Sequence, residues 1–285
     1  MKMNAVLGVV GFTLFSGLSF AEDHKTVSDE TINEQRQALA ESTDGKDFGP
    51  QAPRDIDLKF GHNIRTFGAA PVSAQMNLCN IHFHKNAEHK GGEFTQYAGN
   101  GDGEGYQTGY FYTGKLTAQE LKPIKDGSVC KSNHSQIFPG DTIEVHYVYS
   151  SAQVKPGPTL GSCMSEEIKN PQLRVEAQVY VAVNDAQALN FGELTAHAVR
   201  NGLYQATDIP NNTGTPVSYA GSTTGPDYNE KASPYQVTWN VRPNVEKVNV
   251  DTIGDWCDSD NVFKEDHAHG VRNLVVNPDL LSTLN

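Results

Sequence analysis

The stretch NLCNIHFHKNAEHKGGEF, residues 77–94, decides how this chain folds. Apolar and polar residues alternate through its first half, and this period of two is typical of a β-strand. Successive side chains of a strand point to opposite faces, so His82 and His84 share one face, together with Asn80 and Leu78. Two imidazoles about 7 Å apart on one face can bind the same metal ion. The stretch therefore predicts a strand that carries part of a metal site.

A second alternating run, TIEVHYVYS at residues 142–150, supplies another histidine. His146 stands there among apolar residues. We infer that His82, His84 and His146 bind one metal ion, with the fourth position left open for water, as in catalytic zinc sites. Neutral nitrogen ligands favour Zn²⁺, one ion per chain.

Two polar residues beside these histidines predict a second layer around the metal. A ligating imidazole usually gives its other N–H to an oxygen acceptor, which fixes its orientation. Asn80 and Glu144 each precede a predicted ligand by two residues and share its face. A single strand histidine is more often an ordinary core or surface residue, but the combination of His-x-His with a later Glu-x-His favours a metal site.

The remaining sequence predicts one mainly β (α+β) domain over residues 49–285, built on a central, mostly antiparallel, twisted sheet with short peripheral helices. A polar N-terminal extension at 22–48 precedes it and contains a helix from Asp29 to Glu41. The clearest strands are expected at residues 76–84, 142–150, 173–185 and 235–250.

The N-terminus has the features of a secretory signal peptide, residues 1–21. Lys2 precedes a short apolar run, and Ala21 is a small residue suited to the cleavage site. We therefore expect an exported protein, periplasmic or extracellular, with no membrane insertion. The formal charge of −12 becomes −13 without Lys2, which argues against nucleic acid and anionic membranes as partners. An oligomer is possible.

An even number of cysteines in an exported chain predicts disulfides. The spacings contain no Cys-x-x-Cys, which argues against a cysteine zinc site. Up to two bridges are expected, with three pairings open, among Cys79, Cys130, Cys163 and Cys257.

Taken together, these motifs resemble the carbonic anhydrases. The resemblance covers roughly residues 50–250 and is carried by NIHFHKNAEHK, EVHYVYS, YAGSTTGPDYNEKASPYQVTWNV and APRDID. The first of these is most similar to the δ class, whereas the order of the motifs resembles the α class. The resemblance implies an α-carbonic-anhydrase-like fold and reversible hydration of CO2 to bicarbonate by zinc-bound hydroxide. It also implies the same three histidine ligands and the same two second-layer residues.

Further roles follow from the resemblance alone. Thr224 would hydrogen-bond the zinc-bound hydroxide, Glu88 would accept the proton of that threonine, and Thr223 takes the role if one residue is deleted there. This chemistry is coherent, because a hydroxyl that donates to a carboxylate must accept from hydroxide. Ala220 and Gly225 depart from the family pattern, which affects the shape of the pocket more than the metal.

The resemblance also predicts a CO2 pocket and a proton shuttle. Val148 and Trp239 would form an apolar wall, and His62 would carry protons to the solvent. His89 is expected to be structural. The other histidines are expected to be solvated in loops: His134, His197, His267 and His269.

Two other classes of protein fit parts of the pattern. His82-x-His84-x-x-x-Glu88 also matches the first cupin motif, in which Glu88 becomes a ligand and the metal is iron or manganese. Such a protein would be an oxygenase or an isomerase. A non-catalytic exported zinc-binding protein would bind the metal tightly without turnover.

Overall fold

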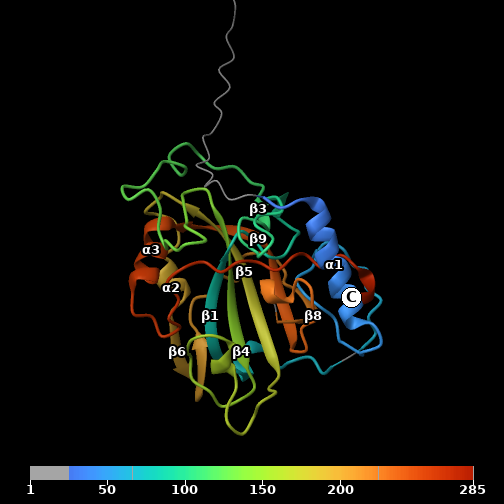
Figure 1. Ribbon diagram of the computed structural model, residues 1–285. Helices are drawn as coiled ribbons and strands as arrows, with labels where there is room; N and C mark the ends of the chain where they lie inside the picture. Colours follow the sequence, from blue (N-terminus) through green and yellow to red (C-terminus); the bar gives the residue numbers. More distant parts are fainter. Residues whose placement is uncertain (1–25, 66, 224, 285) are drawn as a thin grey trace, which may run out of the picture.

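The computed structural model describes residues 26–65, 67–223 and 225–284 (Figure 1). The predicted signal peptide at 1–21 and Thr224 lie outside the described residues.

The molecule is built on one five-stranded sheet with the strand order β1-β4-β5-β9-β8. These strands are β1 (Asn77–Lys85), β4 (Thr142–Ser150), β5 (Leu173–Val183), β9 (Gln236–Asn249) and β8 (Val217–Ser222). Only β5 and β9 are parallel, and the other three pairings are antiparallel. Figure 1 shows this twisted sheet in the centre of the molecule. The prediction of a mainly β fold with a central, mostly antiparallel sheet is confirmed.

Smaller elements surround the sheet. Two hairpin-like pairs are β2 (Phe94–Tyr97) with β3 (Tyr110–Tyr112) and β6 (His197–Arg200) with β7 (Leu203–Ala206). The helices are α1 (Asp29–Thr43), α2 (Phe191–Leu194) and α3 (Val250–Asp258), with 3-10 turns η1 (Ser73–Gln75), η2 (Leu160–Cys163), η3 (Pro226–Tyr228) and η4 (Pro278–Leu280).

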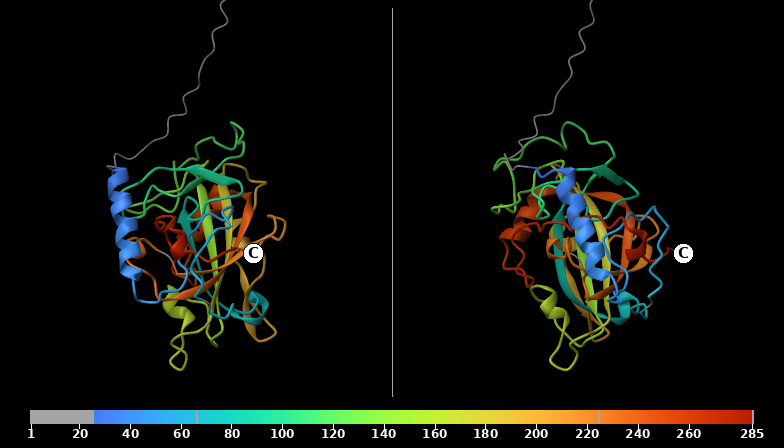
Figure 2. Two further views of the ribbon diagram at one scale, coloured as in Figure 1. Left: turned by 90° about the vertical axis from the view of Figure 1, so that its right-hand side faces the viewer. Right: turned by 45° about the vertical axis from the view of Figure 1, so that its right-hand side comes forward.

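Helix α1 lies along the outside of the molecule beside the C-terminal segment, as both views in Figure 2 show. Its N-cap is Ser28, whose Oγ accepts from the backbone N–H of Thr31 at 3.3 Å. Leu39 packs against Val275 and Leu280 in a small apolar cluster. The helix is therefore held on the body by burial of one apolar face, because most of its other side chains are polar.

Both faces of the central sheet are covered, which explains why every residue of β4 is buried. On one face, Phe83 and Tyr147 belong to a core that includes Phe191 of α2 and Trp256 of α3. The opposite face carries the histidines predicted to bind metal. Alternation along β1 and β4 thus sends apolar side chains into a core and polar ones into a site.

One detail of β1 differs from the prediction. The pairing of β1 with β4 shifts register between Leu78 and Asn80, which is the signature of a β-bulge. Leu78 consequently belongs to the core cluster of Phe83, on the face opposite His82. The prediction that Leu78 shares the face of Asn80 and His82 is wrong, because strict alternation fails across a bulge.

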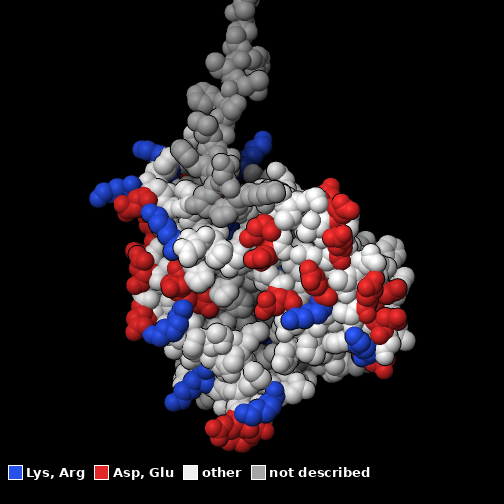
Figure 3. Space-filling model, viewed as in Figure 1, with Lys and Arg blue, Asp and Glu red and all other residues white. Residues whose placement is uncertain are grey.

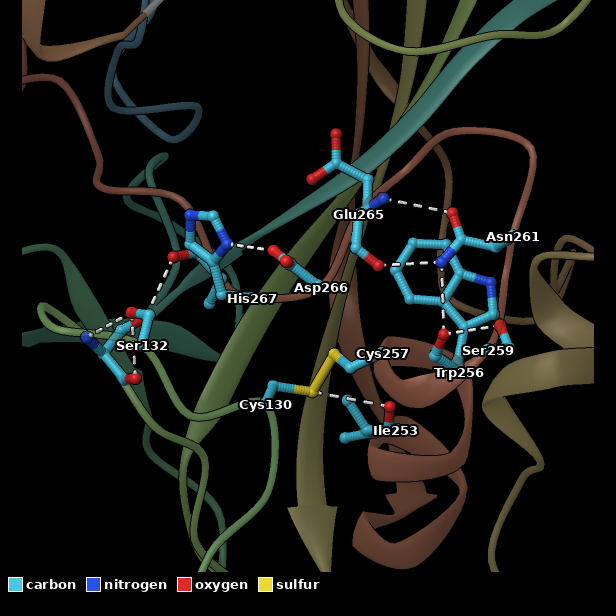
Figure 4. Close-up of a disulfide and its surroundings, with 12 residues drawn as sticks. Cys130, Ser132, Ile253, Trp256, Cys257, Ser259, Asn261, Glu265, Asp266 and His267 are labelled. Atoms are coloured by element: carbon cyan, nitrogen blue, oxygen red, sulfur yellow. Dashed lines mark hydrogen bonds and ion pairs between the residues drawn. A yellow bond between two sulfur atoms is a disulfide. The ribbon is translucent and has the colours of Figure 1, made fainter.

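All four cysteines form disulfides, as predicted, and the structure decides the pairing. Cys79 bonds to Cys163 and Cys130 to Cys257. The second bridge joins a loop to α3 (Figure 4). Disulfides are typical of proteins from oxidising compartments.

Within the described part of the chain, no helix has the length and apolarity that crossing a membrane requires. On the face drawn in Figure 3, the basic side chains are mostly separated from one another, and acidic side chains lie between them. This distribution matches a chain with 34 Asp and Glu against 22 Lys and Arg.

Candidate metal centre

Three imidazoles from two neighbouring strands converge on one point. In the antiparallel pairing of β1 with β4, His82 lies opposite His146, and His84 follows on the same face. The ring centroid of His82 is 5.2 Å from that of His84 and 5.1 Å from that of His146, and His84 and His146 are 4.6 Å apart. One nitrogen from each ring lies within 4.8 Å of the other two, which is close enough to hold a metal ion.

Each imidazole is oriented by an acceptor on its other nitrogen. His82 donates from Nδ1 to Asn80 Oδ1 at 2.7 Å, and His84 donates from Nδ1 to the backbone oxygen of Gly270 at 2.9 Å. His146 donates from Nε2 to Glu144 Oε1 at 2.7 Å. These bonds leave Nε2 of His82, Nε2 of His84 and Nδ1 of His146 as lone-pair donors.

The buried nitrogen of His84 shows that this group of residues fits a metal ion. His84 Nε2 is shielded from solvent and has no hydrogen-bond partner among the described residues. A buried polar atom without a partner is costly, and coordination of a cation by its lone pair would remove that cost. The neighbouring Nδ1 of His146 lies 3.3 Å from Nε2 of His82, so the three donor atoms face one another.

Burial keeps these histidines neutral. It lowers the pKa of His84 to about 4 and, with the neighbouring imidazoles, holds the pKa of His82 well below its usual range. Burial also lowers the pKa of His146, although its hydrogen bond to Glu144 opposes the shift. The neutral imidazole is the form that binds metal, so the site is ready for a cation at neutral pH.

Glu144 is a fully hydrogen-bonded buried carboxylate. Its Oε1 accepts from His146 and from His89 Nδ1 at 2.7 Å, and its Oε2 accepts from the backbone N–H of Glu88 at 2.8 Å. Burial opposes its ionisation, but the hydrogen bonds from His89 and His146 hold the pKa of Glu144 well below its usual range. The second nitrogen of His89 accepts from the hydroxyl of Tyr219 at 2.7 Å. His89 therefore links Glu144 to β8.

Glu88 lies behind the ligands. Its Oε1 accepts from the backbone N–H of Arg272 at 3.1 Å, while its Oε2 is 3.9 Å from His84 Nε2 and 3.8 Å from His146 Nε2. Burial raises the pKa of this carboxyl.

Thr224 lies outside the described residues, whereas the hydroxyl of its neighbour Thr223 is 2.9 Å from Ser233 Oγ.

A cavity of about 990 Å³ opens over the three histidines. Val148 and Trp239 line it, and the Trp239 ring packs at 5.0 Å from that of His146. Three further apolar residues of this wall, which sequence reasoning missed, are Leu173, Val175 and Val237. They lie on β5 and β9, so only the strand order brings them to the same cavity as His146 of β4.

The structure distributes the other histidines differently from the prediction. His62 lies at the surface, 3.1 Å from Asp279, and is not among the residues that line the cavity. His134 and His269 do line it. His269 forms part of the cavity wall, where its ring lies 5.4 Å from that of His82 and its Nε2 donates to Glu265 Oε2 at 2.5 Å, while 43% of its side chain stays exposed to solvent as predicted.

Sequence reasoning also missed Gly270 and Arg272, whose backbone atoms contact the site. Nothing in their side chains could have revealed this role, because a carbonyl and an N–H are present at nearly every residue.

The sheet, the three imidazoles and the apolar-walled cavity define a β-sheet protein with a buried histidine cluster that can hold a metal ion. The family model described as delta carbonic anhydrase matches residues 73–252. The chain therefore belongs to the delta carbonic anhydrase family, a family of lyases, and the resemblance seen in the sequence is confirmed. The cupin alternative is wrong, since a cupin is a double-stranded β-helix and this chain has a five-stranded sheet.

Solved structures similar to this chain are α-carbonic anhydrases. The enzyme of Thermovibrio ammonificans in complex with the inhibitor sulfanilamide is 13% identical, over 84% of this chain and 88% of that one, with a TM-score of 0.28. The enzyme of Photobacterium profundum is 15% identical, over 90% of this chain and 96% of that one, with a TM-score of 0.26. No curated protein sequence gave a significant match.

Proposed function

We propose that this protein catalyses the reversible hydration of CO2 to bicarbonate and a proton, with one Zn²⁺ held by His82, His84 and His146. The observation that carries the proposal is a set of three neutral imidazoles, each oriented by its own acceptor, beneath a cavity with an apolar wall. Zinc at such a site makes hydroxide available near neutral pH, which is the established property of this metal in carbonic anhydrases.

The residues around the ligands have two separate tasks. Asn80 and Glu144, with the carbonyl of Gly270, keep the three lone pairs aimed at one point. Val148 and Trp239 present apolar surface beside the ligands. Because CO2 carries no charge, such a wall can accept it without competing for the metal.

Glu88 and Thr224 are proposed to orient the attacking oxygen. A hydroxyl that donates its proton to a carboxylate can only accept a hydrogen bond from a second partner. Glu88 would accept a hydrogen bond from the hydroxyl of Thr224. The oxygen of Thr224 would then accept a hydrogen bond from the attacking group. Thr223, the alternative for this role, lines the cavity, and its hydroxyl lies 2.9 Å from Ser233 Oγ.

The proposed function includes export of the protein from the cytoplasm. A secretory signal peptide at 1–21 would deliver the chain to an oxidising compartment, and the two disulfides support that location. The activity would then lie in the periplasm or outside the cell.

The test combines metal analysis with stopped-flow measurement of CO2 hydration on the purified mature protein. We expect about one zinc per chain, and we expect His146→Ala to lose both the zinc and the activity. His197→Ala is the matched control, because His197 packs against Phe263 away from the cavity. Zinc without CO2 hydration would instead identify a non-catalytic zinc-binding protein.

A further inference from the structure

The C-terminal strap, which we define as residues 261–272, lies against the free edge of the central sheet. Strand β1 is an outer strand, and the strap pairs with it beside a metal ligand. The backbone N–H of His269 donates to the oxygen of Phe83 at 2.9 Å, and the N–H of Lys85 donates to the oxygen of His269 at 3.3 Å. In Figure 1 this part of the chain crosses the sheet from α3 towards the side of α1.

The strap supplies two backbone groups to the metal centre. The oxygen of Gly270 accepts from His84 Nδ1, and the N–H of Arg272 donates to Glu88. His82 and His146 are oriented by side chains of their own strands, two residues away. His84 is different, because its acceptor comes from a segment 186 residues later in the chain. The direction of its lone pair therefore depends on where the strap runs.

The strap is anchored at its beginning by the Cys130–Cys257 disulfide (Figure 4). Cys257 lies near the end of α3, four residues before the strap. Cys130 lies at the start of a loop that also contacts the strap, because Ser135 Oγ of this loop donates to the backbone oxygen of Ala268 at 2.9 Å. Asn261 closes the first turn of the strap, since its side chain donates to the oxygens of Trp256 at 3.1 Å and Glu265 at 2.7 Å.

The path of the strap at the metal centre leaves no spare room. A Cβ added at Gly270 would lie 3.0 Å from the backbone of Gly105 and 3.4 Å from Pro226. Any side chain there must push the strap, or the loop against it, away from its present position. The carbonyl that orients His84 belongs to this same residue.

We propose that the strap and the Cys130–Cys257 disulfide are positioning elements of the metal centre, on which the affinity of the folded protein for Zn²⁺ depends. The disulfide holds α3 and the 130–135 loop together, both hold the strap, and the strap fixes the tautomer and orientation of His84. The strap lies beyond the 73–252 segment that the family model matches. This inference rests on the proposed function only in taking zinc as the metal.

The first variant to test is the double substitution Cys130→Ser with Cys257→Ser. The affinity for zinc alone is measured by competition with a chelator, and the free energy of unfolding is measured separately on the metal-free protein. We expect the dissociation constant for zinc to rise about tenfold or more at temperatures where the protein stays folded, as when an acceptor behind a metal ligand is removed. A destabilised protein with an unchanged zinc affinity would overturn the proposal, because the disulfide would then be a stability element only.

Two variants with the disulfide intact keep the proposal testable if the double variant does not fold. Gly270→Ala displaces the carbonyl acceptor, and Asn261→Ala opens the first turn of the strap. Both should raise the zinc dissociation constant about tenfold. Asn212→Ala, which removes an exposed amide bonded to Glu246, is the matched control and should leave it unchanged. Wild-type zinc affinity in both Gly270→Ala and Asn261→Ala would refute the positioning role.

The outcome is separable from that of the proposed function, because zinc affinity is measured without CO2. A wild-type protein that binds zinc but does not hydrate CO2 would end the proposed function, and the affinity changes would still support the role of the strap. A wild-type protein that binds no zinc would overturn both.

Discussion

At the scale of single residues, the hydrogen-bond partner of each imidazole determines which nitrogen is left for a metal. Asn80 accepts a hydrogen bond from Nδ1 of His82, whereas Glu144 accepts one from Nε2 of His146. The two strands therefore offer different nitrogens to the same point. For His82 and His146 the acceptor stands two positions earlier on the same strand, which is a feature that sequence can show.

The route of the released proton is also a question about single residues. Hydration of CO2 produces a proton that has to leave the cavity, and imidazoles exchange protons readily near neutral pH. The resemblance predicts His62 for this role, but His134 and His269 line the cavity and His62 does not. Of these two, His134 stacks on Tyr106 with ring centroids 4.7 Å apart.

We therefore expect His134→Ala to lower kcat about tenfold in weakly buffering solution, with kcat/KM unchanged and kcat restored by added imidazole. His62→Ala should behave like the wild type. Stopped-flow measurements across buffer concentrations test both variants. The reverse result, with His62→Ala impaired and His134→Ala normal, would support the role predicted from the resemblance.

At the scale of elements, β4 points alternate side chains into the hydrophobic core and into the cavity, so substitutions on its two faces should affect different properties. Val145 points into the core with Tyr147, whereas Val148 points into the cavity above His146. Both valines are buried and three residues apart, so they form a matched pair of opposite orientation.

Val148→Phe should fill part of the cavity and lower kcat/KM for CO2 about tenfold or more, while zinc remains bound. Val145→Ala should instead lower the free energy of unfolding by about 1–3 kcal/mol and leave kcat/KM of the folded enzyme near the wild-type value. Denaturant titration and stopped-flow assays on both variants distinguish these effects. Loss of zinc in Val148→Phe would show that the residue supports the metal centre and not the substrate pocket.

At the scale of the whole molecule, burying several uncharged imidazoles couples folding to pH. The pKa of His84 falls from its ordinary 6.5 to about 4 in the folded protein. Between these two values the unfolded chain binds more protons than the folded one, so stability rises with pH. The contribution of His84 is fully present above about pH 6.5 and is lost as the pH falls towards 4.

We expect the metal-free protein to lose about 3 kcal/mol of unfolding free energy from His84 alone between pH 6.5 and pH 4, the equivalent of its pKa shift. Burial lowers the pKa of His82 as well, which should add to the loss. Denaturant titrations at several pH values measure this dependence, and His84→Gln should make it shallower. A stability that stays constant between pH 6.5 and 4.5 would contradict the assignment of neutral buried imidazoles.

The sequence by itself determined four of the five strands of the central sheet and most of the candidate metal centre. Alternation in 77–85 and 142–150 placed His82, His84 and His146 on strand faces, and local spacing placed Asn80 and Glu144 beside them. The cysteine count predicted disulfides, although three pairings remained open. These features are local, because a period of two fixes the relative direction of neighbouring side chains whatever the rest of the chain does.

Only the tertiary structure decided what distant segments contribute. The bulge that turns Leu78 into the core, the pairing of Cys130 with Cys257, and the carbonyl of Gly270 behind His84 all depend on which segments pack together. A backbone carbonyl has the same chemistry at every residue, and a cysteine can bond to any other cysteine within reach. Their partners are chosen by the packing of the sheet and the strap, which no short stretch of sequence contains.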